Sequence, residues 1–140
     1  MIDPRQSILE KRLQNIKKIL PISSSKGGVG KSSCAVVSAL LLAQKGYKTG
    51  LFDMDFHGAT DHLFLGITPP FPEEEGGILP FTIRPNLFYM SIAPFTGEHG
   101  TPMRGHDISN AILELLAVTI WGELDYLIID MPPGMGDELL

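Results

Sequence analysis

A glycine-rich loop between an apolar segment and a helix constrains this chain more than any other part of its sequence. The stretch "SKGGVGKS" at residues 25–32 follows the apolar run "ILPIS" and leads into the apolar segment 32–44, which predicts a helix. Glycines let consecutive backbone N–H groups converge on one anion without clashes from Cβ atoms. The N-terminus of the following helix adds positive potential. The sequence therefore predicts a phosphate-binding loop within a strand–loop–helix unit, rather than a turn that merely joins a strand to a helix.

Two lysines flank this loop, and their positions predict different tasks. Lys31 stands at the start of the helix, where it would reach the β- and γ-phosphates of a nucleotide, and the Ser32 hydroxyl would bind Mg²⁺. Lys26 precedes the glycines, so we expect it to lie at the rim of the loop and to point away from its own helix. We therefore expect Lys26 to reach a nucleotide that is held by a second copy of the chain. The predicted nucleotide-binding residues are Ser25, Lys26, Gly27, Gly28, Val29, Gly30, Lys31, Ser32 and Ser33.

Aspartates end two further apolar segments, "KTGLFDMD" at residues 48–55 and "LDYLIID" at residues 124–130. Ligands of open parallel sheets bind outside the carboxyl ends of the strands, so these carboxylates are candidates for the same site. Asp53 and Asp55 share one face of an extended strand. The first is predicted to contact Mg²⁺ through water and the second to orient the attacking water. Asp130 is predicted to hold Mg²⁺. The alternative for all three is a solvated or strand-ending turn.

The order of the expected elements predicts an α/β fold with a mostly parallel sheet flanked by helices. Residues 1–18 are expected to contain an amphipathic lead-in helix, and residues 67–86 an irregular, exposed connection. The last expected strand is followed by only ten residues, too few for another crossover helix and strand, so the chain is expected to be truncated. The remaining expected elements are strands at 19–23, 48–55, 86–94 and 124–130 and helices at 32–44 and 106–122.

Charge and composition narrow the expected partners. The formal net charge of −5 gives no reason to expect binding to nucleic acid or to anionic lipid. Cys34 is the only cysteine, which excludes an intramolecular disulfide and any metal site with two cysteines from one copy. The start of the chain does not have the pattern of a signal peptide, and the longest apolar run is far shorter than the roughly 20 residues that span a bilayer. A cytoplasmic protein without a membrane partner is expected.

Beyond these patterns, "KGGVGKS" resembles the deviant Walker A motif of the MinD/ParA/Mrp/nitrogenase-iron-protein class of P-loop ATPases. In that class the first lysine contacts the ATP of the partner subunit. "WGELDYLIIDMPPGMGDE" and the spacing from the loop through "DMDFHGAT" closely resemble the Mrp-type (ApbC-like) ATPases, which handle iron–sulfur clusters. The resemblance extends from about residue 13 to the end of the chain and implies that residues 19–140 are the N-terminal part of a P-loop ATPase domain.

The resemblance implies a slow ATPase that binds Mg²⁺ and ATP, forms a homodimer around the nucleotide and acts as a switch with iron–sulfur client or scaffold proteins. Its implied catalytic residues are Lys26, Lys31 and Asp55, and its implied metal ligands are Ser32, Asp53 and Asp130. The Cys-x-x-Cys motif with which the family holds a cluster between subunits is absent from this chain. Two alternatives stay open: a non-enzymatic, MinD/ParA-like nucleotide-dependent adaptor, and a fragment without activity of its own.

Overall fold

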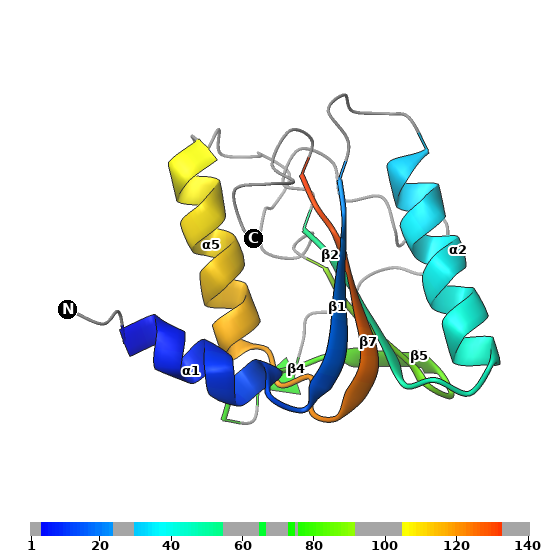
Figure 1. Ribbon diagram of the computed structural model, residues 1–140, viewed down its shortest axis with the longest axis horizontal. Helices are drawn as coiled ribbons and strands as arrows, with labels where there is room; N and C mark the ends of the chain where they lie inside the picture. Colours follow the sequence, from blue (N-terminus) through cyan, green and yellow to red (C-terminus); the bar gives the residue numbers. More distant parts are fainter. Residues whose placement is uncertain are drawn as a thin grey trace.

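A mostly parallel sheet organises the structure, a computed structural model that describes residues 4–23, 30–54, 65–66, 73–74, 76–91 and 105–132 (Figure 1). Within these ranges the main sheet has five strands in the order β1-β7-β2-β6-β5. The first four strands are parallel to one another and β5 is antiparallel to β6, which confirms the predicted fold class. In spatial order the strands are β1 (Ile16–Ile22), β7 (Leu124–Asp130), β2 (Thr49–Asp53), β6 (Leu87–Ser91) and β5 (Phe81–Arg84).

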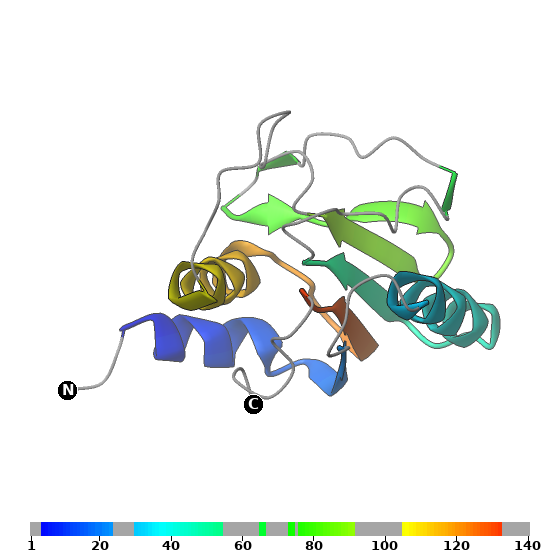
Figure 2. The ribbon, with the colours of Figure 1, turned by 90° about the horizontal axis from the view of Figure 1, so that it is seen from above.

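Helices cover both faces of this sheet, as the view from above shows (Figure 2). Helix α2 (Lys31–Gln44) packs on one face, where its small residues Ala35 and Ala39 are fully buried. Helices α1 (Pro4–Leu13) and α5 (Gly105–Val118) lie side by side on the other face. The Arg12 side chain at the end of α1 donates a hydrogen bond of 3.1 Å to the carbonyl of Ala117 in α5. The sheet is therefore the middle layer of a three-layer α/β arrangement.

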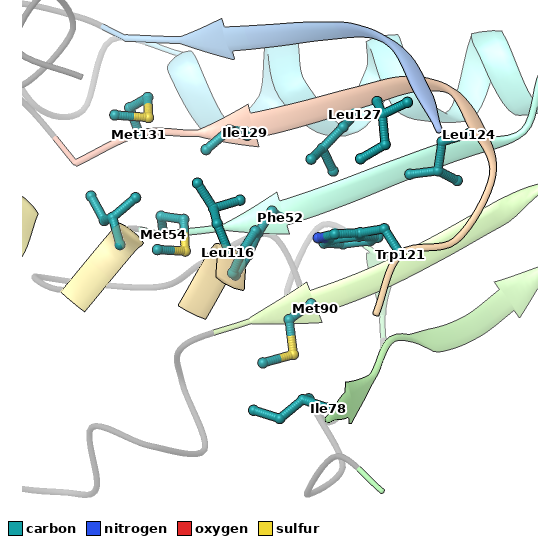
Figure 3. Close-up of a cluster of buried hydrophobic side chains, with 12 residues drawn as sticks. Phe52, Met54, Ile78, Met90, Leu116, Trp121, Leu124, Leu127, Ile129 and Met131 are labelled. Carbon is teal, nitrogen blue, oxygen red and sulfur yellow. The ribbon is translucent and has the colours of Figure 1, made fainter. Parts of the chain in front are cut away.

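The larger apolar cluster fills the space between the sheet and helices α1 and α5 (Figure 3). Phe52 and Trp121 meet near its centre with ring centroids 5.5 Å apart. Gly50 lies beside this cluster, and a Cβ atom there would come within 2.8 Å of both Leu124 and Trp121. Real Cβ atoms do not approach neighbours so closely, so the tight packing of this layer against β2 requires a glycine.

The lead-in helix is shorter than predicted, since it ends at Leu13 and β1 already begins at Ile16. Leu9 and Leu13 do pack into the core from α1. The backbone then pairs with β7, beginning where the Leu124 N–H donates to the carbonyl of Asn15 at 3.1 Å. Helical spacing continues to Leu20 in the sequence, but hydrogen bonds to a distant strand determine the conformation from Ile16 onward.

Strand β1 also runs through Pro21, a residue that has no N–H to donate to a sheet. The Met131 N–H donates to the Ile22 carbonyl at 2.9 Å, so the polar groups of Ile22 face β7. Those of Pro21 therefore face the opposite side, where β1 forms an edge of the described sheet. A proline at this position removes no hydrogen bond of the ladder.

The prediction of an irregular, exposed connection over residues 67–86 is wrong for the part of this range that the structure describes, residues 73–74 and 76–86. This segment contains β5, which pairs with β6, and a two-stranded antiparallel sheet of β3 (Glu73–Glu74) and β4 (Ile78–Leu79). The sequence did not indicate these strands, because each is too short to produce a periodic pattern and the segment is rich in proline and glycine. Ile78 is buried in the larger core cluster, so the segment contributes to the fold.

The other predicted elements are confirmed within a few residues. Helix α2 begins one residue earlier than predicted and ends at Gln44, and Gly46 follows it with a φ of 93°, as a glycine that terminates a helix does. Helix α5 and strands β2, β6 and β7 occupy the predicted segments. Within the described ranges, no helix combines the length and the apolar character needed to cross a membrane.

Asp125 joins three strands at the N-terminal edge of the sheet. One of its carboxylate oxygens accepts a hydrogen bond of 2.8 Å from the Lys48 N–H that precedes β2, and the other lies 3.1 Å from Lys17 Nζ of β1. The backbone hydrogen bond from Lys48, assisted by the hydrogen bond and charge of Lys17, holds the pKa of Asp125 below its ordinary value of 3.8. Ionised Asp125 therefore favours the folded chain.

We expect Asp125→Asn to lower the stability of the chain at neutral pH, because the amide keeps an acceptor but loses the charge. The pKa of Asp125 is lower in the folded than in the unfolded chain, so its contribution is fully present above about pH 4 and disappears as the pH falls through the folded pKa. Urea unfolding midpoints across this range test the expectation, with exposed Glu123→Gln as the matched control. A difference from the unaltered chain that stays constant down to the lowest pH would contradict it.

Candidate functional site

Polar side chains form a row at the C-terminal edge of the sheet. Asp130 at the end of β7 pairs in register with Ile22 on one side and with Asp53 on the other, and Asp53 pairs with Ser91 at the end of β6. Asp53 and Asp130 are fully buried and Ser91 is nearly so. Neighbours in register on parallel strands project to the same face of a sheet. These three residues therefore share one face.

This polar row projects from the face of the sheet that α2 covers. Two residues before this row, Ile128, Leu51 and Tyr89 lie side by side in the same register and pack in one cluster with Ala35 and Ala39 of α2. Since side chains alternate along a strand, the polar row projects to this face as well. The start of α2 consequently lies above two buried carboxylates.

Gly30 begins α2 and leaves its first turn without a side-chain cap. It is the N-cap residue, with a φ of 71° that favours glycine, and its carbonyl accepts the first hydrogen bond of the helix from the Cys34 N–H at 2.9 Å. A glycine offers no side-chain oxygen to the N–H groups of the first turn. Together with the helix dipole, these groups suit an anion at this end of α2.

A buried ion pair links the two halves of the site. Lys31 Nζ in the first turn of α2 contacts Asp130 Oδ1 at the end of β7. The Lys31 side chain is only 5% exposed and that of Asp130 is not exposed at all. A lysine buried this deeply needs an anionic partner, because an uncompensated buried charge is strongly destabilising. Lys31 therefore either contacts Asp130 or requires another anion in its place.

The remaining groups fit a divalent cation that binds together with phosphates. Asp130 Oδ2 is buried and has no hydrogen-bond partner among the described residues, while fully buried Asp53 lies on the adjacent strand. Ser32 precedes buried Ala35 and Val36 by three and four residues, so it lies on the sheet-facing side of α2. No group of three or more metal-binding His, Cys, Asp or Glu residues occurs in the described ranges. Mg²⁺ commonly uses one or two carboxylates and completes its shell with phosphates and water, which matches this donor set.

The structure thus brings Lys31, Asp53 and Asp130 together, with Gly30 and Ser32 at the same helix start. Ser33 belongs to the same turn and is half-buried, since it precedes buried Val36 by three residues and exposed Val37 by four. The other predicted site residues lie outside the described residues, and their roles stay predictions. They are Ser25, Lys26, Gly27, Gly28, Val29 and Asp55.

Sequence reasoning did not single out Ser91, which completes the polar row. The signal was present, because Ser91 follows the apolar run "LFYM" just as Asp53 and Asp130 follow theirs. A serine at the end of a strand is common and does not by itself indicate a functional site. Its place in the row depends on the strand order, which puts β6 directly beside β2.

Comparisons of the chain with known proteins agree on one family. The family model described as NUBPL iron-transfer P-loop NTPase matches residues 15–140. The iron–sulfur cluster carrier protein of Rickettsia felis is 40% identical over 126 residues, which are 89% of this chain and 39% of the relative. The protein of the same description from Methanococcus maripaludis is 39% identical over an alignment of 140 positions that covers 98% of this chain and 48% of the relative.

A solved structure agrees with these matches. A nucleotide-binding protein from Archaeoglobus fulgidus, in complex with ADP, superimposes with a TM-score of 0.79 at 34% sequence identity, and the match covers 94% of this chain and 51% of that protein. The chain thus spans about half, or less, of the length of the relatives that it matches.

The buried ion pair predicts a strong energetic coupling between its two members. Lys31→Met and Asp130→Asn should each lower the free energy of unfolding by about 3–5 kcal/mol, because each strands the other buried group. The double variant should lose far less than the sum of the two single losses, since neither charge then remains. Urea unfolding of the four chains measures this cycle. Additive losses would show that Lys31 and Asp130 do not depend on each other.

Proposed function

This chain belongs to the NUBPL iron-transfer P-loop NTPase family, and we propose that it binds Mg²⁺ and ATP at the C-terminal edge of its sheet. In this proposal the chain forms a dimer, hydrolyses ATP slowly and acts as a switch in iron–sulfur cluster transfer or assembly. The observation that carries the proposal is the buried pair of Lys31 and Asp130 directly after the glycine-rich loop. It places a cation where the loop would hold phosphates and a carboxylate beside it.

Binding of the nucleotide requires Lys31 to exchange one anion for another. In the structure its ammonium group contacts Asp130, which satisfies the buried charge without a ligand. Phosphate oxygens that enter at the start of α2 offer Lys31 a stronger negative partner and also accept from the N–H groups of the first turn. The lysine would therefore leave Asp130 as the phosphates arrive.

The same exchange prepares the carboxylates for a metal ion. Asp130 without Lys31 is a buried anion beside a second buried carboxylate, Asp53, and this arrangement needs a new cation. Asp130 and Asp53, with the Ser32 hydroxyl, would hold Mg²⁺. When bound, Mg²⁺ neutralises negative charge on the phosphates.

Two residues outside the described ranges complete the proposed mechanism. Asp55 would orient the water that attacks the terminal phosphate, since it follows Asp53 by two residues and would share its face if the chain stayed extended. Lys26 would reach the nucleotide of a second copy and stabilise charge there as the phosphoryl group is transferred. Catalysis of this kind consists of positioning and charge stabilisation, which fits a switch that turns over slowly.

The iron–sulfur cluster is the proposed cargo rather than a resident cofactor of this chain. Clusters are commonly bound by four thiolates, whereas this chain has only Cys34, which is exposed on α2. We therefore propose that partner proteins or further copies contribute ligands when a cluster is handled. The relatives that are called iron–sulfur cluster carrier proteins support this choice of cargo. A cytoplasmic location, without nucleic acid or membrane as a partner, belongs to the same proposal.

The two lysines of the loop provide the test. Lys31→Ala should abolish binding of a non-hydrolysable ATP analogue in calorimetry, because it removes the cation at the start of α2. Lys26→Ala should keep that binding but weaken ATP-dependent dimerisation and turnover. Lys45→Ala, at the far end of α2, is a matched control and should change neither. Unchanged affinity in Lys31→Ala would contradict the proposed site.

Mixing the two inactive variants tests the action of Lys26 across the dimer. In a mixed dimer, the Lys26→Ala subunit binds ATP and receives an intact Lys26 from its Lys31→Ala partner, so part of the turnover should return. Heterodimers that form without any recovered turnover would show that Lys26 acts within its own subunit.

A further inference from the structure

Each carboxylate of the polar row is followed in the chain by a buried methionine. Met54 comes directly after Asp53 and is fully buried, and Met131 comes directly after Asp130 and is 2% exposed. Both methionines belong to the larger apolar cluster, on the face of the sheet opposite to the polar row. Figure 3 shows them at the C-terminal ends of β2 and β7. Each strand end that carries a carboxylate on one face is therefore held by a large side chain on the other.

Backbone hydrogen bonds continue the sheet through both methionines, one residue past the ends of the strands. The Met54 N–H donates to the carbonyl of Asp130 at 2.9 Å, and the Met131 N–H donates to the carbonyl of Ile22, also at 2.9 Å. The first of these bonds joins the two segments that carry the carboxylates. Hydrogen bonds at the end of a sheet open readily where few buried apolar contacts support them, so the buried methionines keep these two bonds closed.

Packing with α5 fixes the positions of the two methionines. Ile112 and Leu116 of α5 belong to the same cluster, and Ile112 is only 1% exposed. Methionine is long and unbranched, which suits it to fill the space between a strand end and a helix. The direction of an aspartate side chain depends on the backbone on either side of it. Because a binding site must hold its ligands to within about 0.5 Å, the residue that anchors this backbone matters to the site as well as to the core.

We propose that Met54 and Met131 are positioning residues for the metal site. Each packs in the cluster with α5 and thereby fixes the strand end whose carboxylate, Asp53 or Asp130, binds the Mg²⁺ that accompanies the nucleotide. The inference rests on the proposed function, because it assigns a role within the same site. Groups that orient metal ligands typically change metal affinity by about 10–100-fold when they are removed.

Truncation of each methionine tests this role through the Mg²⁺ dependence of nucleotide binding. Calorimetry with ADP at increasing Mg²⁺ concentration gives the affinity without the metal and the concentration of Mg²⁺ that produces half of its effect. Met54→Ala and Met131→Ala should each require about tenfold more Mg²⁺, while their metal-free affinity for ADP does not fall. Met54→Leu and Met131→Leu nearly conserve the volume of the side chain and should behave like the unaltered chain.

Leu124 provides the matched control, because it belongs to the same cluster but lies at the opposite end of β7. It is 1% exposed, so Leu124→Ala opens a cavity in the same core and should lower the urea midpoint as the methionine variants do. Its Mg²⁺ dependence should stay unaltered. Where an alanine variant does not fold, Met54→Val and Met131→Val take its place, since they remove less volume and suit an extended backbone.

Folded methionine variants with unaltered Mg²⁺ dependence would overturn the inference while the proposed function stands. A Leu124→Ala chain that needs as much additional Mg²⁺ as Met54→Ala would overturn it too, because any cavity in this core would then have the same effect. Absence of Mg²⁺-dependent ADP binding in the unaltered chain would instead overturn both the inference and the proposed function.

Discussion

The contact between Lys31 and Asp130 is the interaction on which the functional edge of this molecule depends. It joins the first turn of α2 to the end of β7 inside a region that excludes water, so neither charge is tolerable without the other. In the function that we propose, phosphate bound at the start of α2 would compete with Asp130 for the ammonium group of Lys31.

The strand order gives this competition its consequences. Strand β7 follows all the other described strands in the sequence, yet it lies between β1 and β2, so Asp130 is adjacent to Asp53 and faces the start of α2. Release of Lys31 would leave two buried carboxylates side by side, and a divalent cation is the natural group to compensate them. We propose that phosphate and metal binding are coupled in this way: the anion would draw Lys31 away from the carboxylates, and the carboxylates would then bind the metal.

The sequence predicted that Lys31, Asp53 and Asp130 lie near one another, because each stands at the end of an apolar strand or at the start of the helix after a glycine-rich loop. Their roles in binding phosphate and metal stay predictions. The fold class followed from the alternation of strands and helices. Contacts between distant segments were not predictable, since the sequence gives no strand order. The pairing of Lys31 with Asp130, the place of Ser91 beside Asp53 and the pairing of β5 with β6 all depend on that order. For the same reason, helical spacing extended α1 too far: pairing of Ile16 with Leu124 overrides it.

The most direct measurement of the central claim is the affinity of Asp130→Asn for ADP with Mg²⁺ present and with Mg²⁺ removed by a chelator. If Asp130 competes with phosphate for Lys31, the variant binds ADP more tightly than the unaltered chain when the metal is absent, and it loses the gain in affinity that Mg²⁺ confers on the unaltered chain. The Asp53→Asn variant keeps the pair of Lys31 and Asp130, so it should lose only the gain in affinity that Mg²⁺ confers. An Asp130→Asn chain that is folded and binds ADP without metal no more tightly than the unaltered chain would contradict the exchange of partners.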